Sequence, residues 1–260
     1  MPDLLLSLGA LGPLLTPRAI ALSIAAVFVA ALLRGFTGFG FALAAVPLLG
    51  MFLSPTQAVP IAIGLQLLGG LIDFRHATRS CHWPSLRWMM LGAVVGSPLG
   101  ALVLSHVPSA VARLVISAIT AMAVLALGRG FALPAMPGRS LTGFTGFLAG
   151  LFNGLAAMPG PPAVAYYMSV PLPRATMRSS LIVFFMLTSV AAMASGLAIG
   201  LVTVQTMCLS LLGLPVLWIG TRIGHMAFIR SSDPIHRRVS IVSLGLIALV
   251  SAAKGVSELY

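Results

Sequence analysis

Residues 19–53 read AIALSIAAVFVAALLRGFTGFGFALAAVPLLGMFL, an apolar stretch that is interrupted only at Arg34–Gly40. A helix needs about 20 apolar residues to cross a bilayer, and this stretch is longer than that. The interruption contains Gly35, Gly38 and Gly40, and glycine lowers helix propensity. We therefore predict two shorter helices that meet at a bend.

A second interrupted stretch covers Leu141–Val170 and is broken by Met158-Pro159-Gly160-Pro161-Pro162. Proline removes a backbone donor and clashes with the preceding helical turn, so this stretch also predicts two half-length helices. The other long apolar stretches are uninterrupted, and each predicts one transmembrane helix. They are Ala58–Ile72, Leu86–Leu104, Val111–Leu127, Leu181–Leu201, Met207–Phe228 and Val239–Ala253.

The composition excludes a water-soluble fold. Of the 260 residues, 59% are hydrophobic and only 7% are charged, whereas a soluble domain carries roughly 25% charge. The apolar stretches do not alternate with polar residues, which excludes a porin-like barrel. The net charge of +11 comes from basic residues scattered between apolar runs, so they form no basic face for nucleic acid. Cys81 and Cys208 are too few for a disulfide framework.

The basic residues also predict the orientation of the chain, because cytoplasmic loops are rich in Lys and Arg. Arginines occur in the segments 72–88, 127–141 and 228–239, but not in the links 105–110 and 202–206. The first three are therefore predicted to be cytoplasmic and the other two external. Each broken stretch must then return to the side that it left, either as a re-entrant hairpin or as two short spans. Two halves of equal pattern and opposite orientation are typical of inverted-repeat transporters.

Repeated motifs support this division independently. Gly35-Phe36-Thr37-Gly38-Phe39 recurs unchanged at residues 143–147, and Gly96-x-x-x-Gly100 is matched by Gly220-x-x-x-Gly224. Such ordered matches indicate an internal repeat. We predict an all-α polytopic membrane protein made of two inverted repeats, each with one broken segment and three transmembrane helices. Residues 1–128 form the first repeat, 129–140 a cytoplasmic linker and 141–260 the second repeat.

The same motifs resemble those of a known family. They are Gly35–Gly40, Pro55-Thr56-Gln57-Ala58, Gly92–Gly100, Gly143–Gly160 and Pro173–Arg178. Over about residues 19–253 the chain resembles the sulfite exporter TauE/SafE family of bacterial anion transporters. The resemblance implies a multi-pass carrier in the bacterial cell inner membrane that exports sulfite, sulfonates or related anions.

The two breaks are the predicted binding site. A helix that begins inside the membrane presents unpaired N–H groups and the positive end of its dipole to an anion. Arginine near membrane depth and polar side chains beside the breaks add further donors. The predicted substrate-binding residues are Arg34, Gly35, Thr37, Gly38, Gly40, Gln66, Thr145, Gly146, Asn153, Gly154, Met158, Gly160 and Arg178.

Each of these residues has a structural alternative. The glycines can serve only to let helices pack closely, and Gln66 can bond to a neighbouring helix. Arg34 can extend its side chain to the membrane interface. Arg178 can be a charge that orients the chain.

The remaining polar residues exclude other classes of site. All four acidic residues lie at the ends or in loops: Asp3, Asp73, Asp233 and Glu258. A carboxylate inside the membrane is therefore absent from the predicted spans, which disfavours cation binding and leaves no oriented base for catalysis. His76, Cys81 and His82 share one loop but lack a fourth ligand. We predict no metal, no cofactor and no enzymatic activity.

The predicted function is secondary transport of a small anion by alternating access, with the site between the two broken segments. Sulfite, a sulfonate such as sulfoacetate, or a related organosulfur oxyanion is the expected cargo, and export the expected direction. The expected partners are this anion and the lipid bilayer, with a homodimer left open and no nucleic acid. Two alternatives stay open: a carrier of sulfate or a carboxylate, including uptake, and a membrane subunit of a complex that does not itself transport.

Overall fold

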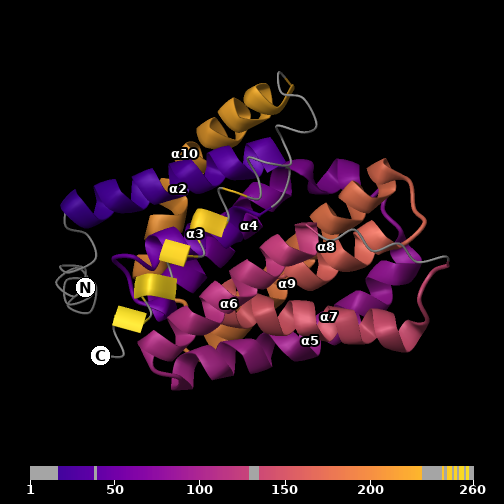
Figure 1. Ribbon diagram of the computed structural model, residues 1–260, viewed down its shortest axis with the longest axis horizontal. Coiled ribbons are helices and arrows are strands. Elements are labelled where there is room, and N and C mark those ends of the chain that lie inside the picture. The colour runs from indigo at the N-terminus through magenta and orange to yellow at the C-terminus, as the bar shows by residue number, and fades with distance from the viewer. Residues whose placement is uncertain are drawn as a thin grey trace, which may run out of the picture.

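The computed structural model describes residues 17–37, 40–128 and 135–229, together with short pieces between residues 242 and 257. Within these ranges all regular structure is helical and no strand occurs, which confirms the all-α class. Of the predicted helix Val239–Ala253, only short pieces are described, and these are helical. In chain order the helices are α2 (Pro17–Thr37), α3 (Phe41–Leu49), α4 (Pro55–Ala77), α5 (Trp83–His106), α6 (Ser109–Gly128), α7 (Arg139–Ala156), α8 (Gly160–Ser169), α9 (Arg174–Ala198) and α10 (Val204–Ile229) (Figure 1).

Within the described part of the chain, four helices are long and apolar enough to cross a bilayer. They are the segments Pro17–Phe36, Trp83–His106, Ala175–Ala198 and Val204–Ala227. Large apolar side chains on these helices face outward, and Leu91, for example, is 62% exposed. Outward-facing apolar surface on several helices is costly in water and favourable in lipid. The chain is a membrane protein.

Helix α4 begins earlier than its apolar stretch predicts, at Pro55 instead of Ala58. The reason is local capping chemistry. Pro55 occupies the first helical turn, where a missing N–H costs nothing. The Ser54 N–H donates to Gln57 Oε1 at 3.2 Å, which is one half of a capping box. Polar residues therefore start a helix that hydropathy alone places later.

Both predicted breaks are present. Helix α2 ends at Thr37 and α3 begins at Phe41, after Gly40 in a left-handed conformation (φ 88°). Helix α7 ends at Ala156, and Ala157 is left-handed (φ 57°). The Ala157 N–H donates to the Asn153 carbonyl at 2.7 Å, and the Met158 N–H donates to the Phe152 carbonyl at 3.1 Å. The bond from Ala157 to Asn153 is that of an αL motif, which closes the end of α7.

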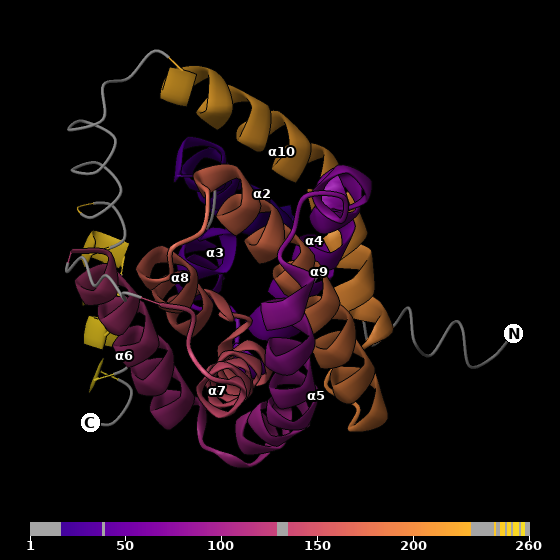
Figure 2. The same ribbon diagram turned by 90° about the vertical axis from the view of Figure 1, so that its right-hand side faces the viewer.

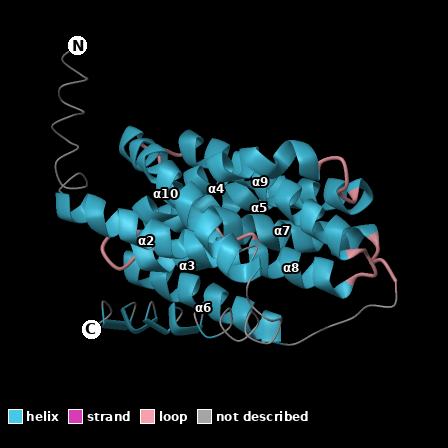
Figure 3. Cartoon of the chain, turned by 90° about the horizontal axis from the view of Figure 1, so that it is seen from above, coloured by secondary structure: helices cyan, strands magenta, loops and turns pink. Residues whose placement is uncertain are grey.

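The two halves of the chain pack across each other. Helix α5 lies along α7, and α10 lies along α2 (Figure 2). Helices α4 and α9 contact each other between these two pairs. Helices α2 and α3 lie toward one end of the molecule, whereas α7 and α8 lie toward the other (Figure 3). Each pair joins a helix from the first half to one from the second, and the buried apolar residues form two clusters that each draw on both halves.

The glycine motifs allow the two helices of each pair to approach each other closely. A methyl group added at Gly96 would collide with the Phe147 carbonyl oxygen, and one at Gly146 with the Met89 carbonyl oxygen. In the other pair, a methyl group at Gly35 would collide with the Thr221 carbonyl oxygen. Small residues that bring two backbones together are typical of helix packing in membranes. The repeated GFTGF motif therefore contributes to both pairs, α5 with α7 and α2 with α10.

Candidate functional site

A cavity of about 70 Å³ lies between the two breaks. A water molecule needs roughly 10–15 Å³ of such volume, so the cavity has room for about five waters or one compact polyatomic ion. Its walls come from α2, α3, α4 and α9 and from both breaks. The lining residues are Arg34, Gly40, Phe41, Ala42, Leu43, Gln66, Gly70, Ala157, Met158, Pro159, Gly160, Ile182, Phe185 and Met186.

The start of α3 forms one wall of this cavity. The left-handed Gly40 turns the chain so that Phe41, Ala42 and Leu43 line the pocket. The first N–H groups of a helix have no carbonyl partner within it; in α3 the first described intrahelical bond runs from the Ala44 N–H to the Gly40 carbonyl at 3.3 Å. These N–H groups carry the positive end of the α3 dipole. The wall therefore attracts negative charge.

The start of α8 is a weaker source of donors. Gly160 lines the cavity, but Pro161 and Pro162 follow it and carry no N–H. Met158 and Pro159 add an apolar surface instead. From the sequence, the helix starts at both breaks were expected to present N–H donors to an anion. The prolines make the site unequal, with amide donors on the α3 side and mainly apolar atoms on the α8 side.

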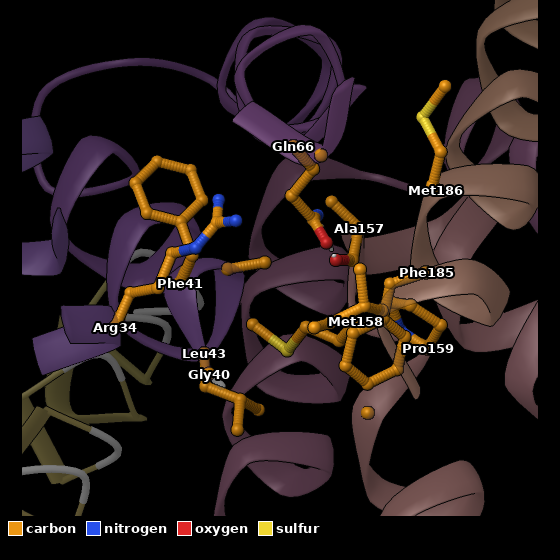
Figure 4. A pocket seen from close by; sticks show the side chains of 14 residues that line it. Arg34, Gly40, Phe41, Leu43, Gln66, Ala157, Met158, Pro159, Phe185 and Met186 are labelled. Atoms are coloured by element: carbon orange, nitrogen blue, oxygen red, sulfur yellow. Dashed lines mark hydrogen bonds between the residues drawn. The ribbon is translucent and has the colours of Figure 1, made fainter. Parts of the chain in front are cut away.

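Arg34 supplies a full positive charge beside the α3 wall. It lies in the last turn of α2, and its Nη1 occupies the space left by Gly69 of α4, 2.8 Å from where a methyl group there would lie. Figure 4 shows Arg34 on one side of the pocket, with Met158, Pro159 and Phe185 across from it. A guanidinium can donate two parallel hydrogen bonds to two oxygens of one anion. Arg34 and the α3 amides thus surround the same space.

Gln66 connects the cavity to the second break. Its side-chain Nε2 donates to the Ala157 carbonyl at 2.7 Å (Figure 4). This contact is the structural alternative foreseen for Gln66, yet the residue also lines the cavity. It therefore holds the left-handed Ala157 in place and presents a polar amide to the pocket.

Several predicted site residues lie elsewhere. Asn153 is fully buried and donates from Nδ2 to the Thr188 carbonyl of α9 at 2.8 Å. The Thr145 hydroxyl donates to the Leu141 carbonyl of its own helix at 2.8 Å. Gly35, Gly146 and Gly154 face the backbone of a partner helix and do not line the cavity. For these glycines the packing alternative describes the observed position.

The other candidates divide as follows. Gly40, Met158 and Gly160 line the cavity as expected, in company with Arg34 and Gln66. Arg178 lines a neighbouring cavity. Gly38 and the side chain of Thr37 lie outside the described residues.

The structure also adds residues that sequence reasoning missed. Ile182, Phe185 and Met186 of α9 line the cavity, but as apolar residues in an apolar span they carry no distinguishing signal. Arg113 of α6 is only 9% exposed, and its Nη2 donates to the Leu53 carbonyl at 3.1 Å. A cation just beyond the end of α3 stabilises that helix end. The position of this arginine inside an apolar span was the feature of the sequence that could have identified it.

Comparison with known proteins identifies the family of this chain. The family model described as "Sulfite exporter TauE/SafE" matches residues 23–251. Searches of curated proteins and of solved structures returned no significant match. The family match covers both breaks, the cavity between them and the two cross-packed helix pairs, α5 with α7 and α2 with α10. The chain therefore belongs to the TauE/SafE sulfite exporter family, which consists of membrane transporters of sulfite-type anions and not of enzymes.

Proposed function

We propose that this protein is a secondary transporter that exports sulfite or a small organosulfonate across the bacterial inner membrane. One observation carries the proposal. The cavity between the two breaks combines the Arg34 guanidinium with the amide end of α3, and none of the described residues that line it is acidic. Such a site favours an anion through full and partial positive charges together.

The walls of the cavity support a compact oxyanion in particular. Phe41, Met158 and Phe185 remove water from the bound ion, and Met158 and Phe185 lie across the pocket from Arg34 (Figure 4). An electrostatic contact is stronger in such a low-dielectric site than in water. A sulfite or a short sulfonate matches this division, because its oxygens face Arg34 and the α3 amides while its remaining surface contacts the apolar wall. The volume of about 70 Å³ disfavours large organic anions.

The arrangement of the two halves supports alternating access. The reciprocal pairs, α5 with α7 and α10 with α2, support an inverted repeat whose two-fold axis passes near the α4–α9 contact. Rocking of one half against the other would open the central cavity to each side in turn. The substrate would stay between the breaks while access changes.

Cysteine labelling tests the inverted orientation. In a background of Cys81→Ser and Cys208→Ser, we expect Val204→Cys to react with an impermeant maleimide on intact cells, and His76→Cys only after permeabilisation. Both positions are exposed. His76 lies in the last turn of α4, and Val204 lies shortly after the end of the counterpart helix α9. Equal labelling of both cysteines from one side would contradict the inverted repeat.

Flux measurements on the purified protein test the transport proposal. Proteoliposomes preloaded with sulfite should release it faster than protein-free vesicles, and external sulfite or sulfoacetate should exchange with it. Stronger exchange with sulfate or acetate would instead identify the carrier as one for those anions. Absence of any flux, together with a partner that co-purifies from the native membrane, would support a subunit of a complex.

A further inference from the structure

A second cavity of about 350 Å³ adjoins the first. The two cavities share Arg34 and Ile182, and the adjacent glycines Gly69 and Gly70 line one cavity each. The residues that line the second cavity come from α2, α4, α9 and α10. They are Arg34, Gly35, Gly69, Arg178, Ile182, Leu214, Leu217, Trp218, Thr221, Arg222 and His225.

Basic side chains from three helices gather in this second cavity. Arg34 comes from α2, Arg178 from α9, and Arg222 and His225 from α10. No acidic residue is among the described residues of the lining. The Arg222 guanidinium lies over the Trp218 ring, 5.1 Å from its centroid, and this cation–π contact holds it at the wall. Basic side chains gathered around one cavity attract anions from solution.

A polar atom without a partner points to a ligand in the same cavity. The Thr221 hydroxyl oxygen is buried and has no hydrogen-bond partner among the described residues, and Thr221 lines the second cavity. Buried polar groups in native proteins are nearly always satisfied by protein, water or ligand. Four basic residues and the threonine that carries this unsatisfied hydroxyl therefore line the same cavity.

We propose that the second cavity is an anion subsite where the transported oxyanion binds before it enters the inner cavity. This inference rests on the proposed function and names the entry step of that same site. Arg178 and His225 lie near the ends of α9 and α10 that the arginine pattern assigns to the cytoplasm. An anion would bind first among Arg178, Arg222 and Thr221. It would then pass Arg34, which lines both cavities, into the space beside α3.

The fluorescence of Trp218 provides a local test. Trp83→Phe and Trp88→Phe leave Trp218 as the sole tryptophan. Sodium sulfite, titrated under nitrogen against purified protein at constant ionic strength, should change its emission saturably. Arg178→Gln leaves the Trp218–Arg222 contact in place and should weaken this binding about tenfold, as expected for one charged contact. Arg18→Gln, an exposed charge in the first turn of α2 and so at the opposite end of that helix from Arg34, should leave it unchanged.

A second variant separates the two subsites. Gly160 lines only the inner cavity, and the nearest side-chain atom to an added methyl group is Phe185 Cζ at 3.9 Å. Gly160→Leu should therefore fill the inner cavity, abolish flux and leave the Trp218 signal saturable. Loss of the signal in Gly160→Leu, or no saturable signal in the parent protein, would overturn the second subsite. If the parent protein bound sulfite at Trp218 but showed no flux, the transport proposal would be overturned and the subsite would stand.

Discussion

Arg34→Gln should lower sulfite flux in proteoliposomes about 100-fold. A hydrogen bond to a charged partner contributes about 1.5–3 kcal/mol, so the loss of two such bonds removes about 3 kcal/mol or more of binding. Each 1.4 kcal/mol corresponds to a factor of ten. The α3 amides remain in this variant, and they account for the residual binding. Initial rates of sulfite efflux at several concentrations measure the effect.

Two companion variants control this experiment. Arg34→Lys keeps the charge but not the paired donors of a guanidinium, so its flux should lie between those of the parent and Arg34→Gln. Arg18→Gln removes an exposed charge in the first turn of α2 that lines neither cavity, and it should transport normally. If Arg34→Gln transported like the parent protein while inserting normally, the cavity between the breaks would not be the anion site.

Gly146→Ala should destabilise the protein, whereas Gly143→Ala in the same helix should not. A methyl group at Gly146 would collide with the backbone of Met89, so α5 and α7 would have to separate. Overpacking of this kind costs about 1–3 kcal/mol. At Gly143 the nearest atom to an added methyl group is the Trp88 carbonyl oxygen at 3.7 Å, an ordinary contact. Alanine there also gains up to about 1 kcal/mol of helix propensity.

Thermal unfolding of both variants in the same detergent measures this difference. We expect a clear fall in Tm for Gly146→Ala and an unchanged or higher Tm for Gly143→Ala. Because the two glycines belong to one GFTGF motif, the pair separates packing from any general effect of losing glycine. Equal Tm values would mean that the close approach of α5 and α7 contributes little to stability.

Much of the fold follows from local chemistry. The breaks between α2 and α3 and between α7 and α8 were predictable because glycine and proline act on the backbone of their own segment. Most helix positions followed from apolar length, but capping at Ser54 extended α4, and α9 begins at Arg174, ahead of its predicted apolar stretch Leu181–Leu201. Arg34 was identifiable because a cation is costly within an apolar span.

The role of the GFTGF motif could not be decided from the sequence. In sequence, its glycines looked equally suited to approach an anion or another helix. In the structure Gly35 and Gly146 contact a partner backbone, whereas Gly40 and Gly160 line the cavity. Asn153 likewise bonds to α9 instead of facing the pocket. The role of a glycine or a side-chain amide depends on the surface that it contacts, and that surface belongs to a segment distant in the sequence.

The amino-acid sequence by itself determined the membrane class, the helices and the two breaks, because each depends on forces that act within one short segment. Only the tertiary structure decided that Arg34 and residues 40–43 share a cavity with residues 157–160, that α9 closes it, and that Arg34 lies between two cavities. Those facts depend on which faces of distant helices meet. Packing of the whole core selects these faces, and apolar side chains that form a wall look the same in sequence as those that face lipid.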